Sequence, residues 1–350
     1  MASAPPNEII VYHYPFSPYA RRVLWYFQLQ GIHYGQCVQP PTLPRPTLEA
    51  LNVNYRRIPL MSIGRTVYCD SRLILRKLET RFGSTPKSSN PKLGLAPLTT
   101  PDQKALANLF ERWTGDGGVF ARATKLIPLD LPVMKDAKFR EDRSSFAGGK
   151  RSWDPEAMRQ ARPEALAGIR EQLEWLESGL LSDGREWVLA TPKASIADIE
   201  AIWLFDWLIE MPGALPAEWS KQFPRVWAWV ARFRAVLKET RNLAPKAVTF
   251  KPEETVSYVL SAQFAPVLDS AGPAGQVEWV DPADSLGLKA GDSVTVWPID
   301  SGMTHKDQGK LVRLSVNEVI IEKEVKGSTI RVSMPRWNFR IIKSSSASKI

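Results

Sequence analysis

The stretch that most constrains the fold of this chain runs from Ile9 to Gly31. It starts with a short apolar run, passes through a turn that contains Pro15 and Pro18, and continues with apolar residues at helical spacing. This order predicts a buried strand, a tight turn and an amphipathic helix. Ser17 lies at the junction, where a small hydroxyl and the first free N–H groups of a helix can meet a bound anion.

The residues that follow predict a small mixed sheet. A second strand is expected over Ile32–Val38. The run from Gln39 to Thr47 contains four prolines, which forbid a regular helix or a central strand and indicate an ordered loop. A short hairpin is expected over 58–69 with its turn at Gly64, followed by a helix over 72–81. The expected order is strand, helix, strand, loop, strand, strand, helix.

Three short motifs occur in order across this region. They are the turn from Pro15 to Arg22, the segment Arg57–Leu60 around Pro59, and the pair Asp70-Ser71, which begins eleven residues after that proline. With this order and spacing, residues 9–82 resemble the thioredoxin-like N-terminal domain of glutathione transferases. The resemblance implies a site for glutathione in this part of the chain.

The resemblance also implies a role for each motif. The family has a cis proline at the position of Pro59, and the residue before it, here Ile58, pairs with the backbone of glutathione. Asp70 is expected to meet the ammonium of the γ-glutamyl group, and Ser71 together with the helix N-terminus its carboxylate. Simple capping of the helix by Asp70 or Ser71 is compatible with this role.

Ser17 is the residue expected to activate the thiol. A thiol is a poor nucleophile until it ionises, and a hydroxyl donor beside a helix N-terminus stabilises the thiolate. The family uses Ser, Tyr or Cys near this turn, and Ser at this position argues against mixed-disulfide chemistry. Tyr12, Tyr14 and Tyr19 lie nearby, and one of the three is the alternative donor, although Tyr12 inside the strand is better explained by packing.

Two reactions are compatible with an activated glutathione thiolate. Conjugation joins the sulfur to a small electrophile, whereas reversible addition to an activated double bond gives glutathione-dependent cis–trans isomerisation. The sequence leaves both open because they use the same glutathione site.

Residues 99–244 change to helical periodicity. Helices are expected over four segments, namely 101–114, 154–181, 195–211 and 224–243. Ser195 and Asp198 form the pattern of a reciprocal N-terminal cap, which resembles a structural motif of the transferase helical domain and is therefore assigned to folding. A set of tryptophans at 203, 207, 227 and 229 is expected in the core.

The segment from 114 to 153 has less regular periodicity and mixed charge. An exposed loop between helices is the preferred interpretation, and a mobile cover over the acceptor-substrate pocket is the alternative. Tyr14, Tyr19, Phe110 and Trp113 are the candidate residues of that pocket.

The last hundred residues depart from an ordinary glutathione transferase. A short helix is expected over 252–264, followed by a connector rich in Gly, Pro and Asp. Five strands in about 55 residues then predict a small closed barrel, in an order that resembles SH3-like or Tudor-like barrels. Such an extension resembles a group of fungal glutathione-transferase-like proteins. The expected architecture is a thioredoxin-like α/β domain over 1–90, an all-helical domain over 91–245, and a connector with an SH3-like barrel over 246–350.

Composition narrows the functional classes. The chain has no apolar run long enough for a transmembrane helix and its start lacks the pattern of a signal peptide, so a cytosolic protein is expected. Cys37 and Cys69 are expected to be reduced packing residues, and the three histidines have no metal-ligand spacing, so no metal is expected. The resemblance to the family implies a homodimer.

Charge is concentrated at the N-terminal end. Residues 1–98 hold 12 Lys or Arg against 4 Asp or Glu, whereas residues 250–350 hold 12 of each. The basic part suits a small anionic ligand, and the balanced charge of the C-terminal part argues against nucleic acid as its partner. Two other classes remain as alternatives: a non-catalytic scaffold that docks partner proteins, and a nucleic-acid adaptor that uses the basic face.

Overall fold

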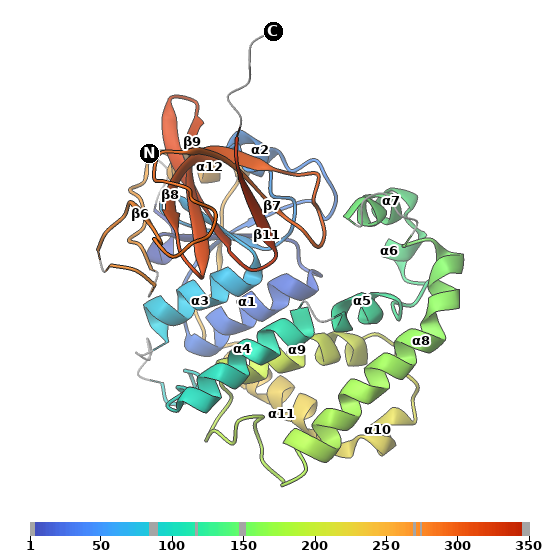
Figure 1. Ribbon diagram of the computed structural model, residues 1–350. Helices are drawn as coiled ribbons and strands as arrows, with labels where there is room; N and C mark the ends of the chain where they lie inside the picture. The colour runs from blue at the N-terminus through green and yellow to red at the C-terminus, as the bar shows by residue number, and fades with distance from the viewer. Residues whose placement is uncertain are drawn as a thin grey trace.

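A computed structural model describes residues 4–83, 90–115, 118–146, 152–268, 271–273 and 275–344. The strand-rich N- and C-terminal parts lie together in the upper half of the molecule, and the helical middle part forms the lower half (Figure 1). Helix α1 (Pro18–Gln30) and helix α3 (Ser71–Phe82) lie between the two halves, with α1 packed against helix α9 (Ile196–Glu210). The boundaries at residues 90 and 245 stay a prediction.

The N-terminal part forms the sheet that the sequence predicts. After a 3₁₀ turn (Pro6–Glu8), β1 (Ile9–His13) pairs in parallel with β2 (Gly35–Val38) and antiparallel with β3 (Leu60–Ile63). The hairpin is completed by β4 (Thr66–Cys69). All five side chains of β1 are buried, as expected of a central strand. The proline-rich loop differs from the expectation in its last residues, because Pro46 starts a short helix α2 (Pro46–Ala50).

Helix α1 ends where a glycine permits it. Gly31 has φ +65°, the left-handed conformation that ends a helix and that side chains with a Cβ rarely adopt. The helix buries Val23, Tyr26 and Phe27 against the sheet and the helical part. This packing fixes the direction of the helix and therefore of the N-terminus at Ser17.

The helical part contains the long helices that the sequence predicts. They are α4 (Pro101–Gly115), α8 (Pro155–Glu174) with a π-helical continuation (Trp175–Leu180), α9, and α11 (Pro224–Thr240), with a short α10 (Trp219–Gln222) before the last. Among the described residues, no helix is both long and apolar enough to cross a bilayer.

The N-terminal cap of α9 agrees with the expected structural role of its motif. The Asp198 carboxylate accepts hydrogen bonds from the Ser195 backbone at 2.9 Å, the Val188 backbone at 3.0 Å and the Trp229 indole at 3.1 Å. Burial raises the pKa of Asp198 and these donors lower it, with burial the larger cause. One carboxylate therefore joins the start of α9 to a loop and to α11.

The prediction of an irregular segment over 114–153 is wrong for most of its described residues. These residues form α5 (Val119–Thr124), α6 (Pro132–Lys135) and α7 (Ala137–Phe146). Helix α7 has few apolar residues, but it buries Phe139 and Arg143 against other elements. Tertiary contacts, which local periodicity does not report, explain why a charged segment is helical here.

The C-terminal extension contains the predicted helix, α12 (Pro252–Ser261), and all five predicted strands. The strands are β7 (Ser293–Pro298), β8 (Asp307–Leu314), β9 (Glu318–Val325), β10 (Ser328–Pro335) and β11 (Phe339–Lys343). Two short strands, β5 (Val248–Thr249) and β6 (Trp279–Val280), pair with β2 and β8.

The expected closed SH3-like barrel does not form. The five strands follow the order β11, β7, β8, β9, β10, and the free edge of β10 pairs in parallel with β4 of the N-terminal sheet. An unpaired strand edge requires hydrogen-bond partners, and β4 supplies them here. The two sheets are thus one open sheet, and a single apolar core contains side chains from both, among them Tyr12, Leu60, Val332 and Met334.

Both cysteines are buried and free, and they pack in this shared core as the sequence predicts.

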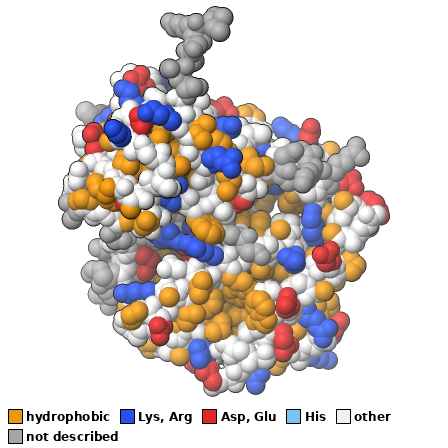
Figure 2. All heavy atoms as spheres, viewed as in Figure 1, with side chains coloured by type: hydrophobic (Ala, Val, Ile, Leu, Met, Phe, Trp, Pro, Cys, Tyr) orange, Lys and Arg blue, Asp and Glu red, His pale blue; other side chains and the backbone are white. Residues whose placement is uncertain are grey.

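Lys and Arg side chains gather where the strand-rich half meets the helical half, with hydrophobic side chains below them (Figure 2).

Candidate functional site

The three motifs meet at one end of three neighbouring interior strands of the sheet. Tyr12 of β1 lies opposite Leu60 of β3, and Leu60 lies opposite Cys69 of β4. β1 runs toward the first motif, β3 starts at the last residue of the second, and β4 ends just before the third. Residues that are far apart in the chain therefore lie at the same end of three neighbouring strands.

Ser17 is the N-terminal cap of α1. Its hydroxyl oxygen accepts a hydrogen bond from the Ala20 backbone at 3.2 Å, and the side chain is 2% exposed. Within the described ranges, no acceptor takes the hydroxyl hydrogen and the Tyr19 N–H has no partner. Pro18 has no N–H. The start of this helix thus keeps one hydroxyl donor and one amide donor for an anion.

The tyrosines near this turn have separate surroundings. The Tyr12 hydroxyl contacts Ser62 at 3.2 Å inside the core, which is the packing role expected of it. The Tyr14 hydroxyl accepts from Arg143 at 3.2 Å, and the Tyr19 hydroxyl donates to the Gly115 carbonyl at 3.3 Å. Burial raises the pKa of Tyr19, which disfavours its phenolate.

The second motif presents an unpaired piece of backbone. The Ile58-Pro59 bond is cis, as the resemblance predicts. Among the described residues, neither the N–H nor the C=O of Ile58 has a hydrogen-bond partner. Ile58 lies just outside β3, so these groups are free to pair with an extended peptide, in the way an added strand pairs with a sheet edge.

The third motif differs from the expectation because Asp70 already has partners. Arg72 donates to both carboxylate oxygens, from Nε at 3.2 Å and from Nη2 at 3.1 Å. The Tyr55 hydroxyl lies 3.4 Å from Oδ2, and Arg57 Nη1 lies 3.7 Å from the same oxygen. Burial alone would raise the pKa of Asp70, but the two guanidinium groups and the Arg72 N–H lower it below its ordinary value. The neighbouring Ser71 hydroxyl has no partner in the described part of the chain.

Asp70 gives the site a pH dependence with a definite sign. Its pKa is lower in the folded chain than in the unfolded one, so its contribution to stability is complete above about pH 4 and is lost as the pH falls. We expect the stability advantage of the wild type over Asp70→Asn to shrink below pH 4, by about 1.4 kcal/mol for each unit of pKa depression. Urea unfolding of both proteins at several acidic pH values measures this; an advantage that stays constant down to the acid transition contradicts it.

Sequence reasoning missed the partners of Asp70. Arg72 follows the motif directly, and its spacing from Asp70 was a usable signal. Tyr55 and Arg57 precede Pro59, but nothing in their local sequence indicates contact with a helix that begins 14 residues after Arg57.

Of the aromatic residues proposed for an acceptor pocket, Tyr19, Phe110 and Trp113 belong to one apolar core and Tyr14 to the other. Phe110 and Trp113 lie in the helical core, where Trp113 donates to Gln172 at 2.6 Å and its ring lies 5.5 Å from that of Phe205. Tyr19 contacts Phe120 and Trp203 with ring centroids 4.7 and 4.8 Å away. Among the described residues, no ring-to-ring contact joins Phe110 or Trp113 to Tyr14 or Tyr19.

Helix α7 packs over the proline-rich loop next to the site. Arg143 donates to the Pro41 carbonyl at 2.8 Å as well as to Tyr14, and Asp142 pairs with Arg56 at 3.1 Å. The segment expected to be an exposed loop therefore contacts the turn that contains Ser17.

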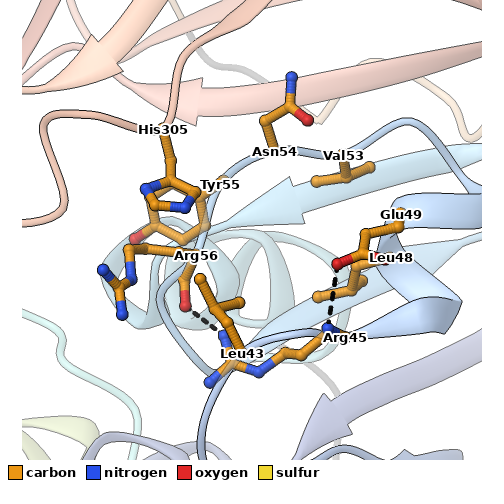
Figure 3. Close-up of a pocket in the computed structure, with 9 residues that line it drawn as sticks. All are labelled: Leu43, Arg45, Leu48, Glu49, Val53, Asn54, Tyr55, Arg56 and His305. Carbon is orange, nitrogen blue, oxygen red and sulfur yellow. Dashed lines mark hydrogen bonds between the residues drawn. The ribbon is translucent and has the colours of Figure 1, made fainter. Parts of the chain in front are cut away.

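A cavity of about 100 Å³ lies beside these contacts (Figure 3). Nine residues line it: Leu43, Arg45, Leu48, Glu49, Val53, Asn54, Tyr55, Arg56 and His305. The Arg45 guanidinium donates to the Arg56 carbonyl and to those of Pro40 and Pro41. Because its guanidinium N–H groups are already bonded to these backbone carbonyls, Arg45 acts here mainly to hold the proline-rich loop in place.

Among the described residues, no group of three or more His, Cys, Asp or Glu is placed to hold a metal ion.

Comparisons with known proteins agree with this arrangement. Residues 11–86 match the model of the glutathione S-transferase N-terminal domain, and residues 122–242 match a domain of unknown function, DUF7962. No curated protein matches the chain.

Solved structures were compared as well. A GST-like protein from Pseudomonas syringae aligns with 97% of this chain and 100% of its own, with 22% identity and a TM-score of 0.65. A glutathione S-transferase from Sinorhizobium meliloti is 20% identical over 68% of this chain and 95% of its own, with a TM-score of 0.49. A glutathione-bound theta class glutathione S-transferase from Xanthomonas axonopodis pv. citri is 19% identical over 67% and 96%, with a TM-score of 0.45. The chain thus contains a segment that matches the glutathione S-transferase N-terminal domain, within a fold similar to that of a GST-like protein.

Proposed function

We propose that the chain is a glutathione-transferase-like enzyme that binds glutathione and activates its thiol for addition to a small electrophile. The addition is either conjugation or the first step of cis–trans isomerisation. Glutathione supplies the nucleophilic sulfur. The proposal includes the expected division of the chain into 1–90, 91–245 and 246–350, a homodimeric assembly, a cytoplasmic location and a fungal origin.

The residues of the site fit a peptide with an anionic sulfur. Ile58 has a free N–H and a free C=O for an extended backbone. Ser17 has a free hydroxyl hydrogen beside the N-terminus of α1. Ser71 has a free hydroxyl at the N-terminus of α3, where a carboxylate is favoured.

The observation that carries the proposal is that three separate sets of free hydrogen-bonding groups lie at the same end of three neighbouring strands. Each suits a different part of the tripeptide. Ile58 suits the peptide backbone, Ser17 the sulfur, and Ser71 the carboxylate of the γ-glutamyl group. Ser17 would hold the sulfur as the thiolate, because a hydroxyl hydrogen and a helix N-terminal amide both favour the charged form.

Calorimetric titration with glutathione tests the proposal. We expect binding, and at a glutathione concentration 100 times the measured Kd a stabilisation of about 2.7 kcal/mol, seen as a higher unfolding temperature. Cysteinylglycine, which lacks the γ-glutamyl group, is the matched control and should bind more weakly. Absence of both heat and thermal shift at millimolar glutathione would falsify the proposal.

A non-catalytic scaffold is the second candidate function. Its supporting observation is that Arg57 and Arg72 already surround the Asp70 carboxylate, which a ligand ammonium would have to share. A stable protein partner in pull-down experiments, together with no glutathione binding, favours this role.

Sedimentation velocity tests the homodimer, which should have twice the mass of one chain.

A further inference from the structure

We propose that Asp300, in the loop after β7, is a positioning residue that holds Arg57 back from Asp70, so that the Asp70 carboxylate stays able to bind an ammonium group. This inference rests on the proposed binding of glutathione. It assigns the C-terminal extension a part in ligand selectivity.

The two arginines beside Asp70 are held differently. Arg72 belongs to the same helical turn, and its backbone N–H, Nε and Nη2 lie 3.0, 3.2 and 3.1 Å from the carboxylate oxygens. Arg57 comes from another segment, and its Nη1 lies 3.7 Å from Oδ2, beyond hydrogen-bond distance. Arg57 is therefore the partner whose distance from Asp70 other contacts can change.

The C-terminal extension supplies those contacts. Arg57 donates from Nε and Nη2 to the Ser301 carbonyl at 3.1 and 2.6 Å, and from Nη2 to the Asp300 carboxylate. These bonds engage Nε and Nη2 with the extension and leave Nη1 at 3.7 Å from Asp70 Oδ2. The preceding residues are held by the same extension, because Asp307 accepts from the backbone of Asn54 and Tyr55 at 2.9 and 3.0 Å.

The charges around Asp70 support the same role for Asp300 as the contacts do. Arg57 pairs with two carboxylates, Asp300 and, at 3.7 Å, Asp70. Without the charge of Asp300, the positive charge of Arg57 is less compensated and repels a ligand ammonium more strongly. Arg57 is then also free to move onto Asp70 and occupy the oxygen that the ammonium needs. Both effects weaken an ammonium-bearing ligand, and neither acts on a ligand that lacks this group.

The experiment compares two ligands on three proteins by calorimetry. The ligands are glutathione and its deaminated analogue, in which a glutaryl group replaces the γ-glutamyl group. The proteins are the wild type, Asp300→Asn and Asp292→Asn. Asp292 is the matched control because it forms an ion pair with Lys343 at 2.7 Å in the same extension, at the opposite end of β7.

We expect the wild type to prefer glutathione over the analogue and Asp300→Asn to lose about two- to fivefold of that preference, the range typical of a partly exposed ion pair. Asp292→Asn should keep the full preference. Asp300 has a side chain that is 39% exposed, so its replacement by Asn should leave the fold intact.

The variant Arg57→Met separates this mechanism from a general effect of the extension. In that background, Asp300→Asn should change the preference less than it does in the wild type, because no guanidinium remains to move onto Asp70 and only the loss of the Asp300 charge is left. A preference that is unchanged by Asp300→Asn, or that falls as much in the Arg57→Met background as in the wild type, overturns the inference while the proposed function stands. A wild type that binds neither ligand overturns both.

Discussion

Replacement of Ser17 by alanine is expected to slow glutathione addition to an electrophile by about 10²- to 10³-fold, the cost of removing one hydrogen-bond donor from a developing or resident anion. The Ser17 hydroxyl hydrogen has no acceptor among the described residues and lies at the N-terminus of α1. The affinity for glutathione should change little, because the Ile58 backbone and the start of α3 are untouched. The thiolate absorbance of bound glutathione should fall together with the rate.

The capping role of Ser17 calls for controls. Alanine at an N-cap costs about 1 kcal/mol of stability, whereas glycine costs only a few tenths. Ser17→Gly therefore removes the hydroxyl while it largely preserves the helix start, and Ser17→Thr keeps both. Asp154→Ala removes the equivalent cap of α8, which lies in the helical part, and should leave the rate unchanged. If Ser17→Ala and Ser17→Gly keep the thiolate absorbance, thiol activation belongs to Tyr14, Tyr19 or the backbone amides.

Replacement of Lys77 by methionine is expected to destabilise the protein by about 3–5 kcal/mol, because it leaves a buried carboxylate without its cation. Lys77 Nζ lies 2.6 Å from Glu318 Oε1, and the two side chains are 4% and 0% exposed. Ser333 donates to the second oxygen of Glu318 at 2.7 Å. This ion pair joins α3 of the N-terminal part to β9 of the extension, and urea unfolding measures its loss.

A double-mutant cycle and an exposed ion pair serve as controls for Lys77. The combined variant Lys77→Met, Glu318→Leu should be less destabilised than the sum of the two single variants, because no unpaired charge remains. Lys92 and Glu239 form a comparable pair at 2.5 Å with side chains 58% and 49% exposed. Lys92→Met should cost less than about 1 kcal/mol. A similar cost for both lysines contradicts the argument from burial.

The sequence predicted the elements that local physical chemistry determines. The strand, turn and helix of residues 9–31 follow from apolar periodicity, a proline at the first helical position and the left-handed Gly31. The five strands of the extension follow in the same way from short β-rich runs between turn residues. The resemblance in three spaced motifs also predicted the cis bond before Pro59.

The motifs that the sequence singled out lie close together in the structure, but the partners of Asp70 were not predicted. Ser17, Ile58 and Ser71 keep free groups at the same end of three neighbouring strands, and their role in binding glutathione stays a proposal. Asp70 does not stand free, because Arg57 and Arg72 reach its carboxylate. Such contacts join residues by the course of the backbone in space, and they leave no periodic signal in the sequence.

The sequence by itself determined the order of the elements, the helix caps and the identity of the three motifs, because each depends on residues within a few positions of one another. Tertiary structure alone decided how the extension is used. Strand β10 pairs with β4 and so opens the expected barrel, and Asp300 reaches Arg57 from 243 residues away in the chain. A strand edge pairs with whichever strand lies beside it, and a partly buried charge interacts with whichever charges lie near it. Folding of the whole chain decides which groups become neighbours in this way.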